Sequence, residues 1–142
     1  MRRGYTLLEL MATLVLVAIV GPAVVGAGHG LRDRAAVVGA REAVAGLLAQ
    51  ARMEARSWGG ARVHLRAEPW EAWVEAGGVV RRRVALQAEW GVEVALSRSR
   101  TETVIRYDAL GLGRVASETL RFRRGDAGTA LVVSGYGRVR RW

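Results

Sequence analysis

RRGYTLLELMATLVLVAIVGP, residues 2–22, places two arginines and one glutamate in front of a long apolar run. From Leu10 to Gly28 there are 19 residues without a charge. As an α-helix rising about 1.5 Å per residue, this run would extend roughly 28 Å, close to the hydrocarbon thickness of a bilayer. Because Arg2 and Arg3 precede it, the positive-inside tendency predicts a single membrane-spanning helix with its N-terminus in the cytoplasm.

Glu9 is unusual at the edge of such a run. The alternative interpretation is a secretory signal peptide, with small residues such as Ala23, Gly26 and Ala27 near its cleavage point. An acid between the basic flank and the apolar core is not typical of such a peptide, and burying it alone costs on the order of a few kcal/mol. A carboxylate in apolar surroundings is tolerable beside a positive group, so Glu9 predicts a cationic partner.

The segment Gly4-Tyr5-Thr6-Leu7-Leu8-Glu9 follows a short basic leader and leads into the apolar helix. In this order it resembles the type IV prepilin processing motif. The resemblance implies that a prepilin peptidase cuts after Gly4 and that Tyr5, the new N-terminal residue, is N-methylated. It also implies that Glu9 acts in assembly by recognising the N-terminal amine of a neighbouring subunit. That amine is then the cationic partner that Glu9 requires.

Beyond Gly30 the apolar positions recur at helical spacing, with charged residues between them. They are Val37, Val44, Leu47, Leu48, Ala51 and Ala55. This pattern predicts an amphipathic helix to about Ser57, ended by Trp58-Gly59-Gly60 because glycine adopts the conformations of a helix stop. Pro22 lacks a backbone N–H and predicts a kink in the first half, or alternatively the end of a shorter helix.

After Gly60 the periodicity changes from helical to alternating, which is typical of strands. Gly77-Gly78 predicts a hairpin turn. We therefore predict an α+β fold, in which a long N-terminal helix packs on an antiparallel β domain of one or two small sheets. The predicted strands are residues 61–66, 70–75, 79–86, 92–96, 103–107, 118–123 and 130–142. The predicted parts are a leader (1–4), a membrane or filament-core helix (5–29), an amphipathic helix (30–58) and a globular β domain (59–142).

The C-terminal half carries a second resemblance. Four of its segments are similar to the GspH/FimT class of minor pilins and pseudopilins. They are Val104-Ile105-Arg106-Tyr107, Gly111-Leu112-Gly113, Leu120-Arg121-Phe122 and the stretch from Leu131 to Arg140. The closing Gly-Arg-Val-Arg is the most distinctive part. The resemblance implies a pilin-like fold, other pilins or pseudopilins as partners, and a location first in the inner membrane, with the C-terminal domain in the periplasm, and then in a pilus or pseudopilus.

All 22 basic residues are arginine, and the formal net charge of +9 indicates a surface suited to anionic partners. In a strand, Arg138 and Arg140 would share one face about 7 Å apart, a spacing suited to phosphates, while Arg141 would point to the other face. In the FimT branch this Gly-Arg-x-Arg tail is implicated in DNA capture, so Arg138, Arg140 and Arg141 are candidates for nonspecific binding of double-stranded DNA. The alternative is a solvated face in an arginine-biased chain, which we favour for residues 81–83.

Catalytic chemistry is poorly represented. The chain has no cysteine, and its two histidines, His29 and His64, show no spacing to acids that suggests a triad or a metal site. Gly111-Leu112-Gly113 lacks the third glycine and the following helix of a dinucleotide loop. We predict no enzyme activity, no metal and no cofactor.

Two functions follow from these predictions. The first is a minor pilin or pseudopilin, a structural subunit that initiates or caps a type IV pilus-like filament and captures DNA during natural transformation. The alternative is a GspH-like pseudopilin of a type II secretion system that does not bind DNA.

Overall fold

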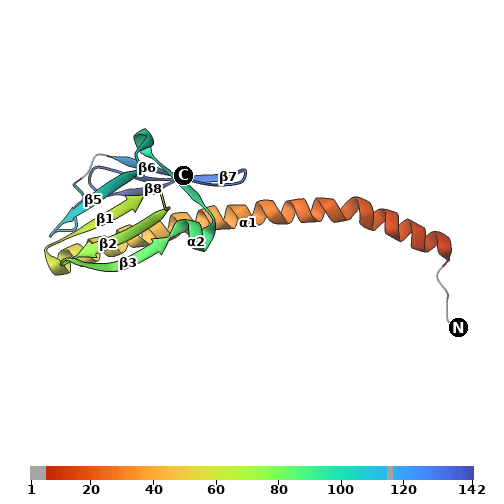
Figure 1. Cartoon of the computed structure of the whole chain (residues 1–142), viewed down its shortest axis with the longest axis horizontal. Helices are drawn as coiled ribbons and strands as arrows, with labels where there is room; N and C mark the ends of the chain where they lie inside the picture. Colours follow the sequence, from red (N-terminus) through yellow and green to blue (C-terminus); the bar gives the residue numbers. More distant parts are fainter. Residues whose placement is uncertain (1–5, 115–116) are drawn as a thin grey trace. The chain divides into compact units, whose positions relative to one another are not determined.

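The computed structural model describes residues 6–114 and 117–142, apart from the side chains of residues 21–27. Gly4 and Tyr5, the predicted cleavage and methylation positions, lie outside the described residues. The chain forms two compact units, Met1–Arg32 and Asp33–Trp142. Figure 1 gives the order of the helices and strands along the chain.

Helix α1, Leu7–Trp58, contributes to both units. The N–H of Glu9 donates to the Thr6 carbonyl oxygen (3.1 Å) and to the Thr6 hydroxyl (3.3 Å), so Thr6 caps the start of the helix. The backbone is helical through Pro22, so the interpretation in which the helix ends there is wrong, and the kink stays a prediction. Gly59 follows the last helical residue with φ of +76°, the left-handed conformation in which glycine ends many helices.

The predicted membrane span covers residues 10–28, and it includes the side chains of residues 21–27 that lie outside the described set. In the part of the chain that the structure does describe, no helix carries an apolar stretch long enough to cross a membrane. The span is therefore not confirmed and stays a prediction.

Within residues 6–114 and 117–142, eight strands form two four-stranded antiparallel sheets, which confirms the predicted α+β fold. The first sheet has the order β3-β2-β1-β5 and the second the order β4-β6-β7-β8. A short helix, α2 (Leu86–Trp90), and one 3-10 turn, η1 (Ser97–Ser99), connect them. The strands are β1 (Gly60–Arg66), β2 (Glu71–Ala76), β3 (Val79–Ala85), β4 (Glu93–Leu96), β5 (Glu102–Asp108), β6 (Glu118–Arg124), β7 (Ala127–Val133) and β8 (Val139–Arg141).

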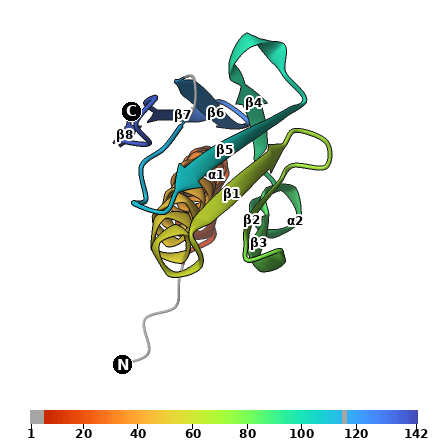
Figure 2. The same cartoon turned by 90° about the vertical axis from the view of Figure 1, so that its left-hand side faces the viewer.

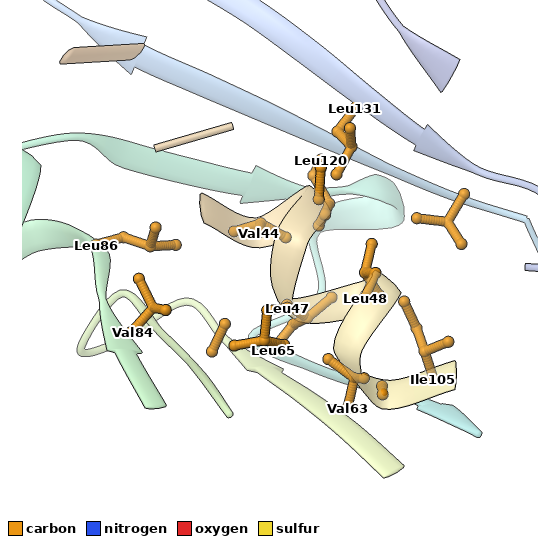
Figure 3. Close-up of a cluster of buried hydrophobic side chains, with 14 of the residues drawn as sticks. Val44, Leu47, Leu48, Val63, Leu65, Val84, Leu86, Ile105, Leu120 and Leu131 are labelled. Carbon is orange, nitrogen blue, oxygen red and sulfur yellow. The ribbon is translucent and has the colours of Figure 1, made fainter. Parts of the chain in front are cut away.

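The core lies where both sheets face the segment of α1 that follows Asp33. Figure 2 shows the strands arranged around this helix, and Figure 3 shows Leu47 and Leu48 of α1 among side chains from the two sheets. All six apolar helix positions predicted from the spacing are buried, with exposed fractions of 0–2%. In the strands, alternate residues such as Val63 and Ile105 are fully buried, as expected when one face of each sheet covers a helix.

Two segments differ from the predicted strands. The segment 130–142 is divided into β7 and β8 by a turn in which Ser134 and Arg138 are joined by a backbone hydrogen bond of 2.8 Å. Gly137 lies in this turn with φ of +79°, so the chain reverses where continuous alternation had predicted one strand. Leu86, predicted as the last residue of a strand, is instead the first residue of helix α2; it is buried, while the next three residues are exposed.

Candidate functional site

Glu9 is an exposed residue in the first turn of α1. Its N–H is occupied by the Thr6 cap, while its carboxylate has no ion-pair partner among the described residues. An acid in the first turn is favoured by the positive end of the helix dipole. The carboxylate of Glu9 at the start of the helix is thus available to bind a cationic partner.

The first turns of α1 expose apolar side chains on every side. Ten large apolar residues between Leu7 and Val20 have exposed fractions of 54–79%. A helix on the surface of a globular domain would carry polar residues on one face, and a helix that is apolar all round is normally buried in a protein core or a membrane. Exposed apolar surface of this extent marks a region that is covered by a partner or by lipid.

Strand β8 sets the faces of the C-terminal arginines. Arg140 lies opposite Val132 of β7, and Arg141 lies opposite Leu131, which is fully buried. Because side chains alternate along a strand, Arg141 belongs to the core side of the sheet and Arg140 to the outer side. Arg138, two residues before Arg140, is exposed and exchanges hydrogen bonds with Ser134 in the turn.

Arg141 is held by a contact with α1. Its Nε donates to both oxygens of Glu42, at 3.0 and 3.1 Å, and Arg41 donates to Glu42 from the other side at 2.9 and 3.1 Å. Desolvation raises the pKa of Glu42, but the hydrogen bonds from Arg41 and Arg141 outweigh it and hold that pKa below its ordinary value. The structure therefore gives Arg141 a role in fixing β8 to the helix. Arg138, Arg140 and Arg141 nevertheless line one hollow of about 430 Å³ together with Ala45, Ala49 and Arg52 of α1.

Exposed arginines of the second sheet come from β6, from β8 and from the turn that precedes β8. Arg121 and Arg123 of β6 are exposed and alternate with the buried Leu120 and Phe122, so they point away from the core. We call Arg121, Arg123, Arg138 and Arg140 the arginine face. Among the described residues, no carboxylate lies within 4.0 Å of any of these four guanidinium groups.

The outer face of the first sheet is also rich in charge, and several of its charges form ion pairs. Arg62 lies 3.9 Å from Glu75, and Arg83 lies 3.5 Å from Glu71. His64 stacks on Trp73 with ring centroids 4.8 Å apart and lies between two glutamates. Arg66 and Arg106 of the same outer face have no carboxylate within 4.0 Å among the described residues. The two sheets therefore differ in degree, because ion pairs hold some arginines of the first outer face and none of the arginine face.

The run of arginines at residues 81–83 is engaged in contacts within the molecule. Arg81 stacks over Trp58 at 4.2 Å and lies 3.9 Å from Glu54, and Arg82 donates to Gln50 at 3.5 Å. Arg82 and Arg83 are exposed and Arg81 is half-buried, and the interpretation of this run as a solvated face stays a prediction. The sequence did not indicate that Arg121 and Arg123 share a sheet with the C-terminal strand, because the pairing of β6, β7 and β8 is a long-range feature.

Comparison with known proteins gives two findings. Residues 1–21 match the family model of the prokaryotic N-terminal methylation motif. Two crystal structures of the type IV minor pilin FimU of Pseudomonas aeruginosa are similar to this chain at 18% sequence identity. The first has a TM-score of 0.58, and the aligned region covers 75% of this chain and 87% of the FimU chain. The second has a TM-score of 0.55, and the aligned region covers 73% of this chain and 90% of the FimU chain. No curated protein sequence matches the chain.

The chain therefore has the fold seen in a type IV minor pilin and carries the N-terminal methylation motif at its start. Both findings agree with the resemblance found in the sequence. The motif includes Gly4, Tyr5 and Glu9, whose individual roles stay predictions.

Proposed function

We propose that the chain is a minor pilin, a structural subunit and not an enzyme, incorporated in a type IV pilus-like filament. The observation that carries the proposal is the combination of the methylation motif at residues 1–21 with a pilin fold behind it. A prepilin peptidase cuts after Gly4 and the new amine of Tyr5 is methylated. The subunit then resides in the inner membrane, with its β domain in the periplasm, until it is assembled with other pilins.

Glu9 is the assembly residue in this proposal. Its exposed, unpaired carboxylate supports such a role, as do the exposed apolar side chains that surround it. In a stack of like helices the mature amine of a neighbour supplies the compensating charge, and the apolar surfaces cover one another. Without that amine, the carboxylate would be buried alone at considerable cost.

Mass spectrometry of the protein isolated from its native membrane tests the processing. The expected mature chain lacks Met1 to Gly4 and begins with Tyr5 carrying one methyl group. A chain that retains its first four residues would contradict the proposal. The matched control is Gly4→Leu, which changes only the residue before the cleavage point and is expected to keep the leader.

DNA capture is a second function of the same subunit, and the arginine face supports it. Four exposed guanidinium groups without acidic partners form a positive surface, and guanidinium groups suit phosphate. The binding that such a surface provides is nonspecific and sensitive to salt. A GspH-like pseudopilin of a type II secretion system is the alternative, in which the same surface does not bind DNA.

Titration of the full-length protein in detergent with a labelled duplex, at several salt concentrations, separates these alternatives. Replacing Arg138 and Arg140 together by glutamine is expected to flatten the plot of log K against log salt by about 0.9 for each phosphate that the variant no longer neutralises. The matched control is Arg62→Gln with Arg83→Gln, which removes the same charge from ion-paired arginines on the outer face of the first sheet. No duplex binding at low salt, or equal effects of both double variants, would contradict DNA capture by the arginine face.

A further inference from the structure

Trp142 has a fixed backbone and an exposed side chain. Its N–H donates to Ala130 (3.0 Å), and its carbonyl oxygen accepts from the N–H of Ala130 (3.1 Å) and from the side chains of Thr129 and Arg41. Its exposed fraction is nevertheless 74%. An indole usually packs against the protein when its backbone is ordered, so the exposure of this one is not explained by the needs of the fold.

The register of the second sheet places this indole beside the arginine face. Ala130 pairs with Arg121 on one side and with Trp142 on the other, so the three residues form one row across β6, β7 and the end of β8. Neighbouring strands are about 4.8 Å apart, so the Cα atoms of Arg121 and Trp142 are separated by roughly 10 Å. Arg140 precedes Trp142 by two residues on the same face, at about 7 Å.

A shallow hollow of about 460 Å³ lies at this row. Its lining includes Arg121, Arg123 and Trp142, the small residues Gly128 and Ala130, and one acidic residue, Asp126. Small side chains leave room for a flat ring against the indole. The hollow thus joins an aromatic ring to two arginines and one aspartate, a net positive lining that suits a ligand both aromatic and anionic.

A second exposed aromatic residue lies in the turn between β7 and β8. Tyr136 has an exposed fraction of 81%, and the order along the chain is Tyr136, Arg138, Arg140, Trp142, each two residues from the next. Aromatic side chains interleaved with arginines are the arrangement by which proteins hold single-stranded nucleic acid, with bases stacked on the rings and phosphates on the cations. A duplex keeps its bases stacked on one another and offers the rings nothing to stack on.

We propose that this surface binds single-stranded DNA, with an unpaired base stacked on Trp142 and adjacent phosphates on Arg121, Arg123 and Arg140. The proposal rests on the proposed capture of DNA and adds the strand state of the ligand. An acidic peptide would match the charge but has no use for the indole, so nucleic acid fits both parts of the surface better.

Fluorescence anisotropy of the full-length protein in detergent tests the proposal, with a labelled 20-mer of thymidylate and a labelled 20-bp duplex as probes. Trp142→Ala keeps the backbone hydrogen bonds of Trp142 and removes only the ring. It is expected to weaken binding of the single strand at least about fivefold, the lower end of the effect of losing one stacked base, and to change duplex binding less than twofold. The matched control, Leu110→Ala, truncates another exposed apolar residue (70%) and is expected to change neither.

The outcomes separate the two proposals. If the duplex binds at low salt and Trp142→Ala changes neither affinity, or lowers both equally, base stacking on Trp142 is wrong while DNA capture stands. If neither probe binds at low salt, DNA capture fails and the strand preference fails with it. If polyglutamate displaces the single strand at equal charge concentration and Trp142→Ala has no effect, the surface serves an acidic protein partner instead.

Discussion

Gly39 on α1 provides a sharp test of how the helix packs in the β domain. A Cβ built on Gly39 would overlap the six-membered ring of Trp90, at 2.8 Å from Cη2 and 2.9 Å from Cε3. Trp90 is packed against the core, so the ring cannot easily retreat. Gly46 lies on the same helix, seven residues later, and a Cβ there would meet nothing within 4 Å.

The two positions predict opposite results for the same substitution. Alanine is favoured over glycine in a helix interior by about 0.5–1 kcal/mol, so Gly46→Ala should raise the free energy of unfolding by about that amount. Gly39→Ala has the same helix-propensity gain, but the overlap with Trp90 adds an overpacking cost of about 1–3 kcal/mol. The Gly39→Ala variant should therefore be less stable than the Gly46→Ala variant by about 1–3 kcal/mol. In a domain of this size the difference corresponds to a separation in Tm of roughly 4 °C or more.

Thermal and urea unfolding of the two full-length variants and the parent, under identical conditions, measure this difference. Circular dichroism follows the helix, and tryptophan fluorescence follows the environment of the rings. Equal stabilisation by both substitutions would show that Trp90 does not lie over Gly39 and would refute the packing of α2 on α1.

Two further predictions concern acids that join distant elements. The pKa of Glu42 is lowered in the folded state, so its ionised form stabilises the fold above the ordinary pKa of 4.5, and this contribution is lost as the pH falls below that value. The stability difference between the parent and Glu42→Gln is about 0.2–1 kcal/mol, because the pair is partly exposed, and should vanish in urea unfolding as the carboxylate is protonated. Glu118 is 3% exposed, and its carboxylate accepts hydrogen bonds from the Ser97 N–H at 2.7 Å and from the Ser97 hydroxyl. Glu118→Gln should therefore lower the free energy of unfolding by about 1–3 kcal/mol. Glu93→Gln, on the exposed side of β4, should change it by less than about 0.5 kcal/mol. Equal effects of the two substitutions would contradict the burial of Glu118.

Local sequence pattern was sufficient to predict much of this fold. The spacing of Val44, Leu47 and Leu48 identified the buried face of the helix, and alternation identified most strands, because each pattern is generated by neighbouring residues. The stop after Trp58 and the turn at residues 77–78 followed from the backbone freedom of glycine, which has positive φ at Gly59, Gly77 and Gly78.

Features that depend on long-range register were not predictable in this way. The pairing of β7 with β8 across a glycine turn divided one predicted strand into two. It also directed Arg141 to Glu42, about a hundred positions earlier in the chain, and brought Arg121 to the same face as Arg140. Periodicity indicates which residues share a face of one strand, but not which strands become neighbours.

The candidate functional site was likewise predictable only in part. The order of residues from Gly4 to Glu9 indicated the N-terminal motif directly, and the family model matches this region. The arginine tail was visible as composition, but the difference between paired and unpaired arginines became apparent only when the partners of each guanidinium group were known.

Incorporation of Glu9→Ala protein into filaments tests the central claim most directly. Sheared filaments and membranes from cells that produce this variant as the sole copy are probed with an antibody against the β domain, with Glu93→Ala as the control for loss of an exposed acid. The account predicts that Glu9→Ala protein is processed and present in the membrane but absent from the filaments, while Glu93→Ala is incorporated normally. Incorporation of Glu9→Ala protein at the level of the parent would contradict the pairing of this carboxylate with a neighbouring amine.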